Sequence, residues 1–148
     1  KMSVKDIDMH FAYVDSAYPP NSILMEFTSN HDENSWNGTE YERLGDAVKT
    51  FAVFTYTIPG MPLIYSGQEA CMNKRLRFFE KDTINWTDCD MRAFYSTLNA
   101  LKAENEALFA GSAGGKMTRI SGNDDTKVFA FAREKDKNKG QIEGIFFV

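Results

Sequence analysis

The sequence has few residues that commonly bind metals, and its charge pattern does not favour nucleic acid. It contains two cysteines, Cys71 and Cys89, and two histidines among 148 residues, and no C-x-x-C pair, so a zinc site is not expected. Two buried or free thiols are the expected state of the cysteines, and a disulfide is the less favoured alternative. The net charge is −4 with scattered basic residues, so no nucleic-acid partner is predicted.

Long apolar runs are also missing. Without a run of about 18 apolar residues, no membrane span is expected. No signal peptide precedes the first predicted helix, but the chain starts at Lys1 without an initiator Met, so the cellular compartment stays open. The hydrophobic content of 43% and the charged content of 26% are ordinary for a globular protein, and they are compatible with an uncharged polyol substrate.

Two apolar segments lead into polar groups. Residues 23–27 predict a strand, and Asn30, His31 and Asp32 follow it directly. A helical segment separates this strand from residues 59–69, which predict a second short strand followed by a glycine turn. A His-Asp pair alone more often marks an ordinary surface loop. Polar groups after consecutive strands are what a (β/α)8 barrel uses for chemistry at the carboxyl ends of its strands.

These motifs resemble the α-amylase family of glycoside hydrolases. The family has F-x-x-N-H-D at the end of its seventh barrel strand and G-x-P-x-I-Y-x-G-x-E in its eighth, and residues 27–32 and 60–69 match both in order. The resemblance covers roughly residues 18–131 and implies that Asp32 is the third catalytic carboxylate, neither nucleophile nor proton donor. A fixed anion there would stabilise the oxocarbenium-like transition state of glycoside cleavage.

The resemblance also implies a substrate-binding set. His31 would hydrogen-bond sugar hydroxyls at the cleavage subsite, and Asn30 belongs to the same motif. Apart from the resemblance, Trp36 lies four residues past Asp32 in the same loop and is a candidate to stack on a sugar ring, with ordinary packing as an equal alternative. Many family members carry an Arg three residues after the motif Asp, where this chain has Ser35, so the resemblance does not define the substrate specificity.

Two catalytic groups of the family have no match in this chain. The nucleophile, an Asp in G-x-R-x-D, and the acid/base Glu are both missing upstream of Asp32. Retaining hydrolysis needs a pair of carboxyl groups about 5–5.5 Å apart, so the chain alone is expected to be inactive. The expected parent is a retaining hydrolase of α-1,4-glucosidic bonds that acts on α-glucan or maltooligosaccharide. A transglycosylase or α-glucosidase of the family, or a non-catalytic binding or assembly protein built on the same barrel, stays open as an alternative.

The predicted fold class is α/β, the C-terminal portion of a (β/α)8 TIM barrel followed by the first strands of an all-β sandwich domain. Residues 1–109 are assigned to the barrel, residues 110–116 to a flexible joint and residues 117–148 to the incomplete sandwich. A complete barrel takes about 250 residues, so the chain is interpreted as an excerpt of a longer enzyme. No cofactor is expected in this chain, and a calcium site elsewhere in the parent stays open.

Periodicity and capping signals locate the other elements. A helix is expected before Pro19-Pro20, and a Thr39–Glu42 capping box starts another, with Leu44, Ala47, Val48, Phe51, Ala52 and Thr55 on its inner face. A second box, at residues 87–90, predicts a helix with Met91, Phe94, Tyr95, Leu98 and Leu101 on one face. Residues 117–120, 128–133 and 142–148 predict strands. Residues 73–86 are interpreted as a solvated charged loop, and Trp86 as a packing residue.

Overall fold

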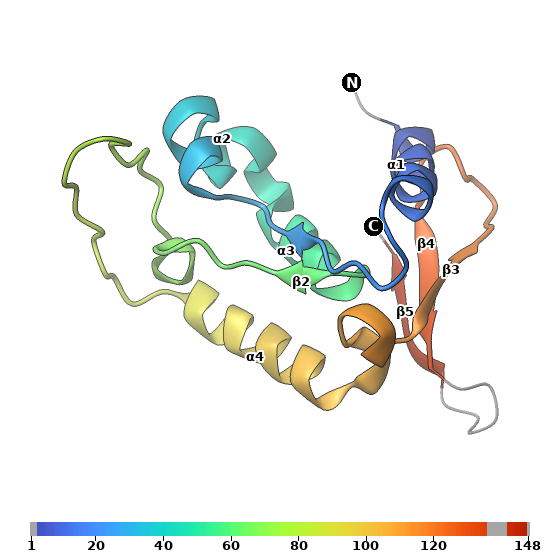
Figure 1. Cartoon of the computed structure of the whole chain (residues 1–148). Coiled ribbons are helices and arrows are strands. Elements are labelled where there is room, and N and C mark those ends of the chain that lie inside the picture. The colour runs from blue at the N-terminus through green and yellow to red at the C-terminus, as the bar shows by residue number, and fades with distance from the viewer. Residues whose placement is uncertain (1–2, 136–141, 148) are drawn as a thin grey trace.

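The computed structural model describes residues 3–135 and 142–147, and it arranges them in two groups (Figure 1). Helices α2, α3 and α4 surround the short strands β1 and β2, while α1 lies beside the sheet of β3, β4 and β5. The bounds are α1 Val4–Ala17, β1 Met25–Glu26, α2 Glu40–Leu44, α3 Val48–Thr57, β2 Met61–Pro62, α4 Asp90–Glu104, β3 Lys116–Ile120, β4 Ala130–Glu134 and β5 Ile142–Phe147. Short 3-10 or π-helical turns occur at Glu33–Asn37, Gly45–Ala47, Gln68–Ala70, Glu106–Leu108 and Gly111–Ala113.

Helices α3 and α4 form the first core. The buried apolar side chains of both helices face each other, as their periodicity predicts: Val48, Ala52 and Tyr56 from α3, and Met91, Tyr95 and Leu98 from α4. Phe51 is the exception in the predicted inner face, because it is 38% exposed. Tyr56 is buried instead and donates a hydrogen bond to Asn99 at 2.7 Å.

The second core lies between α1, the end of α3 and the antiparallel sheet. Val4 and Ile58 pack there with Phe129 and Phe131. The buried Arg133 guanidinium on β4 donates to the backbone carbonyl of Thr57 at 2.9 Å, among other carbonyls, and burial lowers its pKa to about 10. One charged side chain therefore ties the sheet to the carboxyl end of α3.

Strands β1 and β2 are parallel neighbours, and Gly60 allows their close approach. Its φ of +141° is a backbone conformation that glycine adopts readily, and a Cβ there would lie 2.6 Å from the Glu26 Cγ. Glu26 has no ion-pair partner within 4.0 Å among the described residues, and burial raises its pKa. Both strands are two residues long, which is shorter than the apolar runs predicted.

Of the two predicted capping boxes, one is present in the structure and the other is not. The Thr39–Glu42 capping box is confirmed: the Glu42 amide donates to Thr39 Oγ1 at 3.2 Å, and the Thr39 amide donates to Glu42 at 2.7 Å. The box predicted at Thr87 is wrong, because α4 begins at Asp90 and the Thr87 hydroxyl donates to the Ala70 carbonyl at 2.8 Å. Trp86 is 57% exposed, so its predicted packing role is not seen.

The cysteine prediction is wrong as well. Cys71 and Cys89 form a disulfide with a Cα–Cα distance of 6.2 Å. The turn after β2 brings Cys71 back against the start of α4, a proximity that sequence spacing does not show. Over the described ranges, no helix is long and apolar enough to cross a membrane.

Candidate functional site

The carboxyl ends of β1 and β2 lie at the same edge. Met25 pairs with Met61 and Glu26 with Pro62 in parallel register, and the Leu63 amide donates to the Glu26 carbonyl at 2.8 Å. The segment with His31 and Asp32 follows β1 at this edge, and residues 65–69 follow β2. The two motifs therefore follow neighbouring parallel strands at one edge, as the motifs of a (β/α)8 barrel do.

A buried polar network joins the two strand ends. The Thr28 hydroxyl donates to Glu40 at 2.9 Å, and the Gln68 amide donates to the Thr28 hydroxyl at 2.8 Å and to the Tyr95 hydroxyl at 3.2 Å. Gln68 also donates to Glu40, which is only 2% exposed. Burial raises the pKa of Glu40, although the hydrogen bonds from Thr28 and Gln68 act in the opposite direction. This set (Thr28, Glu40, Gln68 and Tyr95) is called the buried network below.

Arg43 and Asn30 fix the segment that follows β1, next to the buried network. Arg43 donates to the Thr28 carbonyl at 2.6 Å and to the Gly38 carbonyl at 3.0 Å. The Asn30 side-chain carbonyl accepts the Glu33 amide at 2.7 Å, so this predicted substrate-binding residue also caps the helical turn that follows. Its amide group can still donate elsewhere.

His31 and Asp32 stand at the surface of the site. The His31 Nε2 lies 3.5 Å from an Asp32 carboxylate oxygen, and the two side chains are 66% and 59% exposed. An imidazole and a carboxylate at this distance can contact neighbouring hydroxyl groups of one polyol. Their exposure leaves them open to an external ligand.

The predicted residue Trp36 lies in an aromatic group that sequence reasoning missed. Its ring centroid is 5.3 Å from that of Phe78, and Phe78 in turn stacks on His31 at 5.6 Å. Phe78 and Phe79 come from the loop at residues 73–86, for which the sequence predicts a solvated charged loop and the family resemblance implies a place at the border of the substrate cleft. Two consecutive phenylalanines in an otherwise charged loop were the signal available in the sequence.

The charged groups of that loop do form compensating pairs, as predicted. Lys74 bonds to Asp82, Arg77 lies 2.8 Å from Glu80, and Arg75 lies 2.8 Å from Glu42. The side chains after β2 have structural partners too, since Glu69 accepts the Gly67 amide at 2.9 Å.

One cluster resembles a metal site by composition. Cys71, Cys89 and Asp90 present ligand-type atoms within 4.8 Å of one another. Because the two sulfurs are bonded to each other, neither is available as the thiolate that a metal requires. Nothing in this cluster therefore supports a metal centre.

The parallel strands β1 and β2, with the His31–Asp32 segment at their shared edge, define the class of the protein. It has a mixed α/β fold of the kind found in part of α-amylase-type proteins. A scan against protein-family models gives no match. The sequence is 30% identical over 132 residues to "Alpha-amylase MalA" of Haloarcula japonica, covering 84% of this chain and 18% of that protein. The chain thus spans about a fifth of the length of this relative.

Solved structures agree on the fold. The maltogenic α-amylase AmyB of Thermotoga neapolitana matches with a TM-score of 0.74 and 21% identity, covering 89% of this chain and 30% of that one. A cyclomaltodextrinase matches at 0.60 with 23% identity over 78% and 20% of the two chains, and an α-amylase from H. orenii at 0.60 with 22% identity over 90% and 32%. The resemblance to the α-amylase family predicted from the motifs is confirmed by these matches.

Proposed function

We propose that this chain is part of a retaining α-glucan hydrolase in which Asp32 stabilises the cationic transition state. The observation that carries the proposal is the exposed His31–Asp32 pair at the shared carboxyl edge of β1 and β2. It is supported by the match to an α-amylase over 84% of the chain. The proposed fold is the C-terminal portion of a (β/α)8 barrel, with residues 117–148 starting a β-sandwich domain.

Each proposed residue has a role that its geometry permits. The Asp32 carboxylate is open to a ligand, and a fixed anion gains most when the sugar ring becomes positively charged. His31 would donate to or accept from ring hydroxyls, and Asn30 would use its remaining amide donors. Trp36 would contact the apolar face of a sugar ring.

The nucleophile and the acid/base of this proposed enzyme lie outside the 148 residues. In double displacement, one carboxylate attacks the anomeric carbon while the other carboxyl group protonates the departing oxygen. Asp32 supports both steps electrostatically and transfers no proton. The substrate is proposed to be an α-1,4-linked glucan or maltooligosaccharide, because the relatives found are named amylases and a cyclomaltodextrinase.

The test is hydrolysis of a soluble maltooligosaccharide by the complete protein that contains this sequence. We expect turnover with retention of the anomeric configuration, which proton NMR of the first product measures. The 148-residue chain alone should show no turnover. A complete protein that neither binds nor cleaves maltooligosaccharides would contradict the proposal and favour a non-catalytic binding or assembly role.

A further inference from the structure

Arg43 on α2 contacts the segment of residues 28–38 at its start, in its middle and at its end. Its Nη2 donates to the Thr28 carbonyl at 2.6 Å, and its Nε donates to the Gly38 carbonyl at 3.0 Å. Between these two points, a carboxylate oxygen of Glu33 lies 3.6 Å from Nη1 of the same guanidinium. One side chain therefore spans the whole segment that carries the proposed catalytic carboxylate.

Helix α2 is itself anchored, so Arg43 extends from a fixed base. Glu40, one turn before Arg43 on the same helix, accepts the Thr28 hydroxyl at 2.9 Å inside the buried network. The capping box of Thr39 and Glu42 fixes the start of the helix. Thr28 is thus bonded to α2 twice, through its hydroxyl by Glu40 and through its carbonyl by Arg43.

The interior of the segment is closed by its own hydrogen bonds. The Asn30 side-chain carbonyl accepts the Glu33 amide at 2.7 Å, and its backbone carbonyl accepts the Asn34 amide at 2.9 Å. The Gly38 amide donates to the Glu33 carbonyl at 3.0 Å. Asp32 is 59% exposed, so little packing holds its side chain in place. Its position depends on this bonded turn, and the position of the turn depends on the two ends that Arg43 holds.

We propose that Arg43 is a positioning residue for the proposed reaction, in which it fixes the backbone that holds the Asp32 carboxylate beside the cationic transition state. This inference rests on the proposed function. A charged group stabilises a transition state most when it is already in place as the new charge develops. A misplacement of about 1 Å can cost about 10²-fold in rate, even when the mutated residue does not touch the substrate.

The contacts of Arg43 require a guanidinium and not merely a cation. A guanidinium presents its donors in a planar fork of fixed geometry, so it can bond acceptors on two sides at once. A lysine has the same charge but carries all its donors on one nitrogen at the end of a flexible chain. Arg43→Lys therefore removes the geometry of the contacts and keeps the charge.

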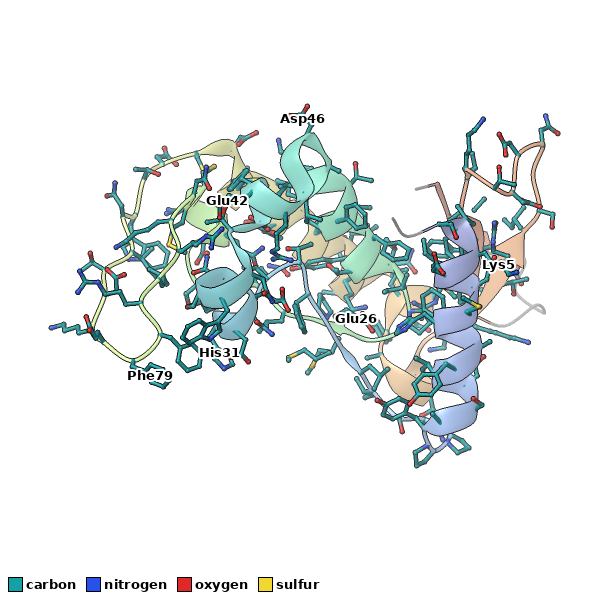
Figure 2. The ribbon with its side chains drawn as sticks, turned by 90° about the horizontal axis from the view of Figure 1, so that it is seen from above. Lys5, Glu26, His31, Glu42, Asp46 and Phe79 are labelled. Carbon is teal, nitrogen blue, oxygen red and sulfur yellow. A yellow bond between two sulfur atoms is a disulfide. The ribbon has the colours of Figure 1, made fainter. Side chains whose placement is uncertain are left out.

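Arg119 on β3 offers a matched control for Arg43. Both side chains are 25% exposed, and Arg119 also donates to backbone carbonyls, at 2.8 and 3.0 Å, in β4 and the turn before it. It pairs with Asp8 on α1 at 3.2 Å. Figure 2 shows Lys5 of α1 at the other end of the molecule from His31. Arg119→Lys therefore makes the same chemical change away from the 28–38 segment.

The test compares the two substitutions in the complete protein, with and without the Asp32 carboxylate. We expect Arg43→Lys to lower kcat for a maltooligosaccharide about 30-fold with KM within about threefold, because the positioned charge acts mainly in the transition state. Arg119→Lys should leave both constants within about twofold. In the Asp32→Asn background, Arg43→Lys should lower kcat/KM no more than about twofold, since the charge that Arg43 positions is already absent.

The double variant separates positioning from a general loss of structure, which would lower activity in both backgrounds. Equal kinetics for Arg43→Lys and Arg119→Lys, in a wild type that cleaves the substrate, would overturn the positioning role and leave the proposed function standing. An equal loss from Arg43→Lys with Asp32 and with Asn at position 32 would also overturn it. If Arg43→Lys does not fold, Arg43→Gln keeps an amide donor for one carbonyl and takes its place with the same expectations. A wild type that does not bind maltooligosaccharides would remove both proposals.

Discussion

The segment after β1 passes from a buried to an exposed environment within four residues. Thr28 is 8% exposed and bonds within the buried network, whereas Asp32 is 59% exposed at the rim. Thr28, Gln68 and one carboxylate oxygen of Glu40 bond to one another, although the other Glu40 oxygen and the Ser29 hydroxyl have no partner among the described residues, whereas the Asp32 carboxylate is open to solvent or a ligand. The packed polar groups and the groups proposed for chemistry are therefore adjacent but separate, and mutation should distinguish them.

The largest effect should come from replacing Asp32 at the exposed edge after β1, and it should appear in kcat/KM. Asp32→Asn in the complete protein is expected to lower kcat/KM by about 10²–10³, or roughly 3–4 kcal/mol, by analogy with loss of one preorganised electrostatic group. The melting temperature should stay unchanged because Asp32 is exposed. Steady-state kinetics on a maltooligosaccharide, with thermal unfolding as the control, measure both. Near-normal turnover would remove Asp32 from the mechanism.

The disulfide should matter for stability and little for chemistry. Cys71 and Cys89 are 18 residues apart in sequence and close the loop that carries Phe78 and Phe79. Replacing both by serine should lower the free energy of unfolding by about 3 kcal/mol, the loop-closure value for this length. Denaturant unfolding of the complete protein measures it. A thiol titration that finds two free cysteines in the untreated protein would contradict the pairing.

Loss of hydrogen bonds in the buried network should lower the free energy of unfolding more than loss of the Glu40 charge does. Glu40→Ala leaves the Thr28 hydroxyl without its acceptor and removes one of the acceptors of Gln68, and it should cost about 2–3 kcal/mol of unfolding free energy. Glu40→Gln keeps an acceptor without the buried charge, so at pH 7 it should be as stable as the wild type or more stable.

The pH dependence sharpens this test. Because burial raises the pKa of Glu40 above 4.5, its contribution to stability is fully present below pH 4.5 and is lost as the pH rises through the raised pKa. The stability of the wild type relative to Glu40→Gln should therefore decrease from pH 4 to pH 7. A constant difference across that range would show that Glu40 does not titrate differently on folding.

The smallest effect should come from His31. His31→Ala is expected to lower kcat/KM about tenfold, partly through KM, because a hydroxyl contact exists in both the ground state and the transition state. The same change removes the ring that stacks on Phe78. A kcat loss equal to that of Asp32→Asn would assign His31 to the transition state alone.

Local signals in the sequence predicted the helices and strands better than they predicted contacts between residues far apart in the chain. The Thr39–Glu42 box and the apolar stripe of α4 depend on residues one turn apart, so the sequence alone contains them. The motif after β1 predicted the shared edge of the two strands because parallel neighbours place their carboxyl ends together. The rest depended on contacts across long separations, such as Cys71 with Cys89 or Trp36 with Phe78. Spacing along the chain does not contain that information.

The most direct test of the account is the selectivity of Asp32→Asn between two ligands. A cationic imino-sugar resembles the charged transition state, and maltose resembles the ground state. We expect isothermal titration of the complete protein to show the affinity for the cationic ligand falling about 100-fold in Asp32→Asn while the affinity for maltose stays within about threefold. Equal changes for the two ligands, or no change in either, would contradict a transition-state role for Asp32.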